Sequence, residues 1–458
     1  MDTLLKLIQK VNTYLSDYVL VVLLGGTGIF FTFRTGFVQL RYFKEGMRNL
    51  IGGLRKKDTH TTGISSFQAL STAIAAQVGT GNIIGASGAI LTGGPGALLW
   101  MWIIAFFGMA TSYAEAVLSQ ETKKVHPNKP ASGGPVYYIK KAFPNSFGIF
   151  LSKFFALATV LSLGFMGAMV QSNAISATAK LAFGIPPHIT GIAVSLGAFV
   201  IFIGGINRIA AVSEKIVPLM AAIYIAIGVI ILCIRAAYLP EAFSMIIKYA
   251  FKPAAIIGGG VGSALKTAIT QGVKRGLFSN EAGMGSTPHA HAVANVKKPH
   301  DQGVAAMVGV FIDTFIVLTI TGLTIVSTLY AGKGPLSPYA IPQAAEGITP
   351  ANMMQISLGN TFGNMAVGSI MVAVCLFFFA FSSIISWNYF GKINADYLWG
   401  KKFSYFYTIT ATVFIILGSI LSASIVWELA DLFNQLMVLP NVLALWALSS
   451  VVAKAAKK

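Results

Sequence analysis

The sequence contains eleven apolar stretches that are long enough for a helix to cross a bilayer, which needs about 20 residues, and several of them are much longer than that. Apolar residues make up 55% of the 458 residues and charged residues only 10%, whereas a soluble domain carries about 25% charged residues. This composition excludes a soluble globular protein and an intrinsically disordered one. The stretches cover residues 17–33, 65–90, 95–119, 148–180, 189–206, 210–234, 256–290, 303–329, 363–392, 403–422 and 427–450.

Cysteine content and net charge exclude several other classes of protein. The two cysteines, Cys233 and Cys375, both lie in apolar stretches, so we expect neither a disulfide framework nor a cysteine metal cluster. A net charge of +18 in a soluble protein would indicate nucleic acid. Here the basic residues cluster between apolar stretches, so we expect no nucleic-acid partner. Residues 1–17 lack a small-residue cleavage site and are not predicted to be a signal peptide.

The distribution of basic residues predicts the topology. If the N-terminus is outside, the inside segments hold 22 Lys and Arg residues and the outside segments hold 7. The inside segments are then 34–64, 119–147, 207–216, 291–302, 391–402 and 449–458. This bias predicts a multi-pass protein of the cell membrane, with its N-terminus outside and its C-terminus in the cytoplasm. The basic stretch from Arg34 to Lys57 can also contact lipid headgroups.

Two spans carry polar interruptions that predict broken helices. In residues 77–82, the sequence Gln-Val-Gly-Thr-Gly-Asn places two glycines and polar side chains inside an apolar stretch. The alternative is that such glycines only allow close helix packing. In the seventh span, Thr270–Gly276 forms a more polar interruption, after which the apolar pattern resumes at Leu277. Two interrupted helices at corresponding places in two halves indicate the binding site of a transporter.

The positions of the two interruptions divide the chain into two sets of five spans. We expect an extra span and a basic segment in 1–64, a first five-helix repeat in 65–235, a second in 236–450, and a cytoplasmic tail in 451–458. Because each set has an odd number of spans, the second inserts in the opposite sense, as an inverted repeat requires. The two sets show no clear sequence identity, so hydropathy and the interruptions alone support the repeat.

Two long motifs resemble those of a known family. The run Gly93–Ile103, followed by Gly108–Thr111 and Glu115, resembles the signature of the sodium:alanine (alanine or glycine:cation) symporters, with Leu99 where a Phe is usual. The run Gly276–Gly285 is also similar to this family. The resemblance implies an all-α LeuT-type fold, with a five-plus-five inverted repeat. It also implies uptake of alanine or glycine driven by Na⁺ as the coupling ion, without an organic cofactor.

The resemblance also implies where the substrate binds. In LeuT-type symporters, backbone N–H groups at the first break bind the substrate carboxylate, and the matching positions are Gly79, Thr80 and Gly81. The free N–H groups and the positive end of the downstream half-helix suit an anion. Gln171 on the fourth span is a further candidate contact, with Asn173 as a weaker one. At the second interruption, backbone groups come from Thr270, Gln271, Gly272, Val273 and Gly276.

The candidate sodium ligands lie on two spans. Carbonyl groups at the end of the upstream half-helix suit a hard cation, and an adjacent hydroxyl pair on the ninth span completes the site in the LeuT-type pattern. The alternative is that both hydroxyls bond only within their own helix. The candidate ligands are Ala75, Gln77, Val78, Asn82, Phe379, Ser382 and Ser383.

Charged residues inside the spans are functional candidates by default. Lys274 and Arg275 lie beside the second interruption with Glu281 on the same segment, and we predict an ion pair or gate there. Direct substrate binding by these side chains is the alternative. Glu115 and Asp313, in neighbouring spans, belong to the same group of candidates.

Two other functions remain open from the sequence. A proton-coupled permease on the same fold would use Glu281 or Asp313 as its proton carrier. A membrane-embedded metal enzyme would use Glu281, His289 and His291. The two histidines are two residues apart and so do not share a helical face, and we expect no metal site other than that for sodium.

Overall fold

The computed structural model describes residues 2–55, 64–126, 129–252, 261–337 and 346–457. Nearly all of these residues are helical, and the strands among them form one antiparallel pair. This pair joins β1 (Lys124–His126) to β2 (Lys129–Ser132), with Lys124 opposite Ser132. The last basic residues of the stretch that begins at Arg34, Lys56 and Lys57, lie outside the described residues, as do residues 256–260 of the seventh predicted span.

The helical elements account for every predicted apolar stretch in the described part of the chain. In chain order they are α1 (Asp2–Tyr14), η1 (Leu15–Leu20), α2 (Val21–Arg34), α3 (Val38–Arg41), α4 (Phe43–Arg55), α5 (Ser66–Gln77), η2 (Gly81–Gly85), α6 (Ala86–Gly93), α7 (Ala97–Thr122), α8 (Pro135–Ala142), α9 (Ser146–Thr159), η3 (Val160–Gly167), α10 (Ala168–Phe183), α11 (Pro187–Ile203), α12 (Gly205–Ile234), η4 (Ala236–Tyr238), α13 (Leu239–Phe251), α15 (Val261–Asn280), α16 (Pro288–Ala292), α17 (Pro299–Val310), η5 (Phe311–Leu318), α18 (Thr319–Ile325), η6 (Val326–Tyr330), α19 (Met353–Phe362), α20 (Met365–Trp399), η8 (Lys401–Phe403), α21 (Ser404–Ile420), α22 (Ala423–Ala447) and α23 (Ser449–Ala455).

Seven helices of the described residues are long and apolar enough to cross a membrane, and a bent pair makes an eighth. The bent pair joins Ser66–Gln77 to Gly81–Gly93 at an angle of 47°. The other three predicted spans correspond to α2, α11 and α15, which are shorter or more polar. The count of eleven crossings therefore stays a prediction, although each predicted stretch coincides with helix.

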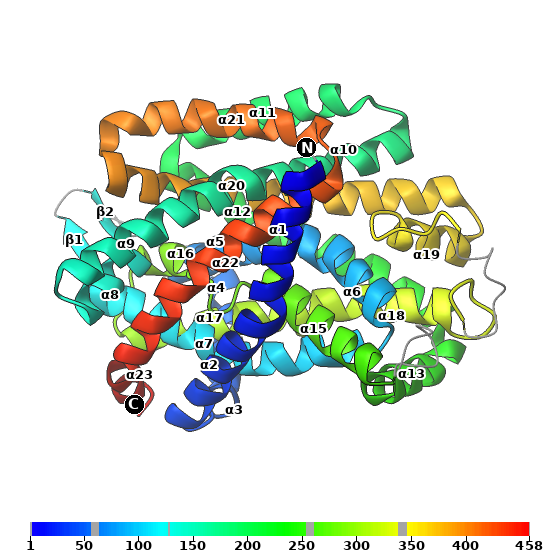
Figure 1. Ribbon diagram of the computed structural model, residues 1–458, viewed down its shortest axis with the longest axis horizontal. Coiled ribbons are helices and arrows are strands. Elements are labelled where there is room, and N and C mark those ends of the chain that lie inside the picture. Colours follow the sequence, from blue (N-terminus) through cyan, green and yellow to red (C-terminus); the bar gives the residue numbers. More distant parts are fainter. Residues whose placement is uncertain (1, 56–63, 127–128, 253–260, 338–345, 458) are drawn as a thin grey trace.

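The connecting elements gather at two opposite ends of the molecule. Figure 1 shows α8 and the two strands at one end, and α13 and α19 at the other. These elements belong to segments predicted to lie on opposite sides of the membrane, namely 119–147 against 235–255 and 330–362. The arrangement agrees with that segregation, and which end faces the cytoplasm stays a prediction.

The first helix break occurs where the sequence predicts it. A reciprocal capping box starts α5, because Ser65 Oγ accepts from the Gln68 N–H and Gln68 Oε1 accepts from the Ser65 N–H. The helix ends at Gln77, Val78 is extended with φ −78° and ψ 93°, and the π-helical turn η2 begins at Gly81. A short non-helical segment thus lies in the buried centre of a bent span.

The second break lies later in the chain than the sequence predicts. The expected interruption at Thr270–Gly276 is wrong, because α15 runs without interruption to Asn280. Close packing explains the two glycines in that interval: a Cβ atom at Gly272 would lie 2.5 Å from the Ala97 carbonyl oxygen of α7. The non-helical segment is Glu281–Thr287, between α15 and α16.

Candidate functional site

Amide side chains occupy backbone N–H groups at the first break. The Gly79 N–H donates to Asn82 Oδ1 over 2.9 Å, and the Thr80 N–H donates to Gln171 Oε1 over 3.1 Å. Asn82 in turn donates through Nδ2 to Asp313 Oδ1 over 2.6 Å. These five residues are buried, so the side chains replace the hydrogen bonds that the interrupted helix lacks.

The end of α15 meets the first break. Ser279 Oγ donates to both carboxylate oxygens of Asp313 over 3.1 Å, and Gln77 Nε2 donates to the Asn280 carbonyl over 2.8 Å. A Cβ atom at Gly81 would lie 3.1 Å from Ser279 Cα, so the two segments are in direct contact. Asp313 therefore accepts hydrogen bonds from both broken helices.

Oxygen atoms from α5 and α20 converge beside the first break. Ser382 Oγ lies 3.3 Å from the Ala75 carbonyl oxygen, and Ser383 Oγ lies 3.4 Å from that of Val78. Both hydroxyls also lie within 3.0 Å of the Phe379 carbonyl oxygen, in their own helix. Ser383 Oγ also lies 3.2 Å from the Ala76 carbonyl oxygen. Each hydroxyl has a single hydrogen, so these contacts describe a cluster of six oxygens, the ligand type that a hard cation prefers.

Some predicted sodium ligands are not part of this cluster. Asn82 bonds to Asp313 and to the Gly79 N–H, and among the described residues it makes no hydrogen bond with the hydroxyl pair. The Gln77 side chain donates to the Asn280 carbonyl. The ligand predicted at this residue is its backbone carbonyl, and that stays a prediction. Asn173, the weaker candidate for a substrate contact, is also directed away from the break, because its Nδ2 donates to the carbonyls of Gly418 and Leu421.

The residues predicted to form the second break are not at the site. Their backbone groups belong to the helix α15, so they are not free to bind a ligand, and that prediction is wrong; the residues are Thr270, Gln271, Gly272, Val273 and Gly276. The end of the same helix, Ser279 and Asn280, takes that place instead.

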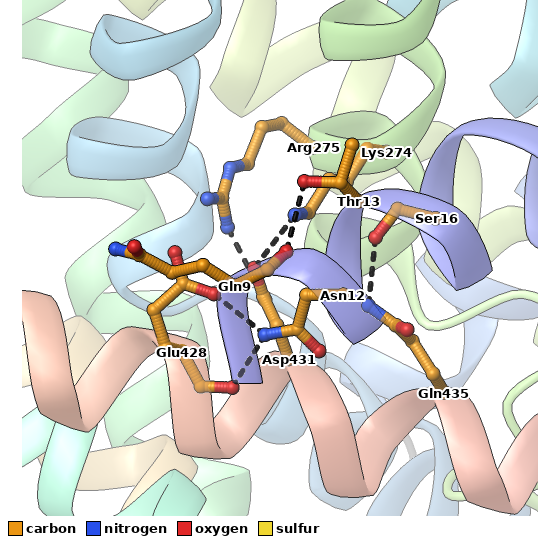
Figure 2. Close-up of polar contacts among 9 residues, drawn as sticks. All are labelled: Gln9, Asn12, Thr13, Ser16, Lys274, Arg275, Glu428, Asp431 and Gln435. Carbon is orange, nitrogen blue, oxygen red and sulfur yellow. Dashed lines mark hydrogen bonds and ion pairs between the residues drawn. The ribbon is translucent and has the colours of Figure 1, made fainter. Parts of the chain in front are cut away.

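Lys274 and Arg275 each form an ion pair, and their shared partner is Asp431 rather than Glu281. Lys274 Nζ lies 3.0 Å from Asp431 Oδ2, and Arg275 contacts Asp431 Oδ1 at 3.4 Å (Figure 2). The Arg275 guanidinium also lies over the Trp427 ring, 4.9 Å from its centroid. The chain leaves α15 at Glu281 with a φ of 58°, and this carboxylate accepts from Ser286 Oγ and from Trp387 Nε1. The predicted ion pair forms, but among the described residues Glu281, Glu115 and Asp313 take no part in it.

The first helix, which consists of α1 and the turn η1 that continues it, is attached to α22 on both sides of Asp431. Asn12 Nδ2 donates to the carbonyl and carboxylate oxygens of Glu428, and Gln435 Nε2 donates to Ser16 Oγ over 2.7 Å (Figure 2). A small, mostly apolar cavity of about 40 Å³ lies between η1 and α2 on one side and α15 and α22 on the other. The extra helix, the ion pair and the end of α15 thus form one cluster.

The two histidines serve as structural hydrogen-bonding groups. His289 Nδ1 lies 2.8 Å from the Ser286 carbonyl oxygen and His289 Nε2 lies 2.8 Å from Asn394 Nδ2. His291 Nδ1 lies 2.6 Å from Gln302 Nε2. Within the described ranges, no group of three His, Cys, Asp or Glu residues could hold a metal ion.

Residues 1–458 match the model of the sodium:alanine symporter family. The chain belongs to the sodium:alanine symporter family. It is 38% identical to the sodium/alanine symporter AgcS of Methanococcus maripaludis, over 98% of this chain and 96% of that protein. It is also 38% identical to the amino-acid carrier protein AlsT of Bacillus subtilis, over 98% and 91% of the two chains.

Solved structures confirm the LeuT-type fold that the sequence predicts for this family member. The crystal structure of MhsT in complex with L-phenylalanine matches with a TM-score of 0.58 and 16% identity, over 87% of this chain and 98% of that one. A mutant of the Eremococcus coleocola manganese transporter matches with a TM-score of 0.53 and 15% identity, over 85% and 80%. This symporter is a multi-pass membrane protein, and its family and fold are those of secondary transporters rather than enzymes.

Sequence reasoning missed the closeness of Asp313 to the first break of the symporter and the role of Ser279. The polar and glycine-rich run from Ser279 to Gly285 could have located the second break, since it places hydrogen-bonding side chains beside two glycines. The position of Asp313 had no local signal, because its partner Asn82 is 231 residues away in the sequence.

Proposed function

We propose that this protein is a sodium-coupled symporter that imports small neutral amino acids, alanine and/or glycine, by alternating access. The observation that carries the proposal is the cluster of six oxygens formed by α5 and α20 next to the first break. The names of its relatives AgcS and AlsT support an alanine-type substrate.

The oxygen cluster gives a physical route for coupling. The carbonyls of Ala75 and Val78 lie at the C-terminal end of the upstream half-helix, α5. The hydroxyls of Ser382 and Ser383 come from α20. A sodium ion held by all of them fixes the backbone at Val78, one residue before Gly79. Because the same backbone binds the substrate, the ion raises the affinity for the substrate, and the substrate raises the affinity for the ion by the same factor.

The substrate carboxylate binds to the N–H groups of Thr80 and Gly81 in this proposal. The Thr80 N–H is occupied by Gln171 Oε1, so binding requires Gln171 to release it and to become a side-chain contact of the substrate. The space is small, since a Cβ atom at Gly81 would already lie 3.1 Å from Ser279 Cα. Such a site favours amino acids with a small side chain.

The ion pair of Lys274 and Arg275 with Asp431 is proposed to act as a gate. It joins α15, the upstream half of the second broken helix, to α22. Alternating access moves broken helices relative to their neighbours, so contacts of this kind must open and close in the cycle. Direct substrate binding by Lys274 or Arg275 is disfavoured, because Asp431 occupies both cations.

Uptake by proteoliposomes tests the proposal. We expect uptake of labelled alanine or glycine with an imposed inward Na⁺ gradient, and little uptake with a K⁺ gradient of equal size at constant pH. An inward proton gradient without Na⁺ should not replace the sodium gradient. Equal uptake with and without Na⁺ would contradict sodium coupling.

A proton-coupled permease is the second candidate. Asp313 and Glu281 are fully buried, touch the two breaks, and have no Lys or Arg partner among the described residues. A buried carboxylate without a cation can carry a proton across a transport cycle. Uptake driven by a proton gradient alone, and lost in Asp313→Asn or Glu281→Gln, would favour this candidate.

A further inference from the structure

Glu115 has no part in the proposed coupling or gating. It lies on α7, is fully buried, and was expected to join an ion pair or gate. Among the described residues, both ion pairs involve Asp431, so no Lys, Arg or His partner neutralises Glu115. A carboxylate that is buried without a cation is costly, and hydrogen-bond donors must compensate for the water that it has lost.

The donors come from the second break and from α22. Glu115 Oε2 accepts from the Gly283 N–H over 3.1 Å, and Glu115 Oε1 accepts from the Gly285 N–H over 2.9 Å. Asn441 Nδ2 donates to Glu115 Oε1 over 2.7 Å and to the Gly283 carbonyl over 2.9 Å. Tyr138 donates its hydroxyl to Asn441 Oδ1, which fixes the orientation of this amide. Three donors and no acceptor surround the carboxylate, which matches its ionised form.

The conformation of the segment explains why it needs such a partner. Glu281, Gly283 and Gly285 have φ values of 58°, 84° and 79°, in the left-handed region that a helix cannot contain. The Glu281 N–H still bonds to the Leu277 carbonyl over 2.9 Å and closes α15, but the N–H groups of Gly283 and Gly285 bond to Glu115 instead of to carbonyls one turn earlier. Close packing prevents relaxation, because a Cβ atom at Gly283 would lie 2.5 Å from Leu24 and one at Gly285 would lie 2.8 Å from Phe155.

We propose that Glu115 is a positioning residue that holds the non-helical segment Glu281–Thr287 in shape through its charge, and thereby sets the affinity for the substrate. Its two oxygens replace the helical acceptors that the segment lacks. Glu115 does not touch the substrate and does not carry the coupling ion.

The connection to the substrate runs along the chain. The segment follows directly after Ser279 and Asn280, which contact Asp313 and Gln77 at the first break. If the segment loses its anchor, these two residues lose their fixed position beside Gly81. This effect on affinity rests on the proposed function, whereas the effect on the shape of the segment does not.

Hydrogen–deuterium exchange of the purified full-length protein tests the shape directly. In Glu115→Gln, a single amide oxygen remains for two N–H groups, and the new NH₂ group faces donors. We expect peptides covering residues 281–287 to exchange at least about tenfold faster than in the wild type, since hydrogen bonds to a charged group are lost. Peptides of α11, which packs against α10 and α21, should be unchanged.

A second variant separates charge from volume. Glu115→Asp keeps the charge and both oxygens but is shorter, whereas Glu115→Gln keeps the size and loses the charge. We expect the Gln variant to have the larger effect on exchange and on the half-saturating alanine concentration. The reverse order would show that Glu115 only fills space, and would overturn the proposal. Unchanged exchange in Glu115→Gln would also overturn it.

Two further measurements complete the test. Na⁺ binding without alanine should stay within about twofold of the wild type in Glu115→Gln, because its ligands lie on α5 and α20. Ser119→Ala, one turn later on α7, is the matched control, since Ser119 is buried and, among the described residues, its hydroxyl bonds only to the Ala116 carbonyl in its own helix. If Glu115→Gln does not accumulate, Asn441→Ala removes a donor from the same network and should also speed exchange. A wild type that binds no alanine would contradict the proposed function, but the exchange result would still decide the role of Glu115.

Discussion

The two helix breaks of this symporter are stabilised in different ways. The first is short, and neutral amides of Asn82 and Gln171 occupy its N–H groups. The second spans Glu281–Thr287, and the carboxylate of Glu115 occupies its N–H groups. A neutral amide is released more easily than a buried carboxylate, because hydrogen bonds to a charged group are stronger. The first break is therefore suited to exchange its partners for a ligand, and the second to keep a fixed shape.

The largest expected effect comes from removing an exchangeable N–H group. Thr80 has a φ of −60°, which proline can adopt, so Thr80→Pro removes the N–H without demanding a new φ at that residue. We expect this variant to lose alanine binding, whereas Thr80→Ala, which keeps the N–H, should retain most of it. Sodium-dependent binding of labelled alanine to the purified variants measures the difference. Similar binding by both variants would place recognition in the side chain.

The ligand itself can be changed with a smaller effect. Alaninamide keeps the ammonium and methyl groups of alanine but has no negative charge to offer the N–H groups of Thr80 and Gly81. It should bind at least ~30-fold more weakly than alanine, because charge-assisted hydrogen bonds are worth roughly 1.5–3 kcal/mol each. Competition with labelled alanine in excess Na⁺ gives the ratio of affinities. Equal competition would show that the first break does not recognise the carboxylate.

The oxygen cluster tests whether the first break depends on an ion. The double variant Ser382→Ala, Ser383→Ala removes two of the six oxygens. The half-saturating Na⁺ concentration should rise about tenfold or more, as expected when a metal site loses ligands, and alanine binding should partly recover at saturating Na⁺. A sodium dependence equal to that of the wild type would make the hydroxyl pair purely structural.

The contrast between the breaks also explains what the sequence could predict. The first break has its own signal, since Asn82 lies three residues from the Gly79 N–H that it binds. The second break is held by Glu115 and Asn441. Glu115 is at least 168 residues away in the sequence from the two glycines that it contacts, and Asn441 is 158 residues away from Gly283. Local pattern therefore located the first break and the helices, whereas Thr270–Gly276 was wrongly chosen because packing glycines resemble unwinding ones.

The same limit applies to the charges near the second break. The pairing of Lys274 and Arg275 with Asp431 depends on how α15 and α22 pack, which hydropathy cannot show. Glu281, seven residues after Lys274, would share its helical face if α15 continued. The left-handed conformation at Glu281 ends the helix and directs this side chain to Trp387 instead.

The variant with the smallest expected effect on transport is Asn12→Ala, in the first helix. Asn12→Ala removes the hydrogen bonds that join the first helix to Glu428 on α22. We expect the unfolding temperature to fall, because a buried partner of a charged group is lost, while alanine affinity stays within about twofold of the wild type. Thermal unfolding in detergent and alanine binding, measured on the same preparation, test both parts. Thr13→Ala is the matched control, since within the described part of the chain the Thr13 hydroxyl bonds only to the Gln9 carbonyl in its own helix. The expected result would mean that the first helix supports the ion-pair cluster without shaping the substrate site. A large loss of alanine affinity in Asn12→Ala would instead make the first helix part of the transport machinery, and the fixed region around the second break would then extend to the first helix.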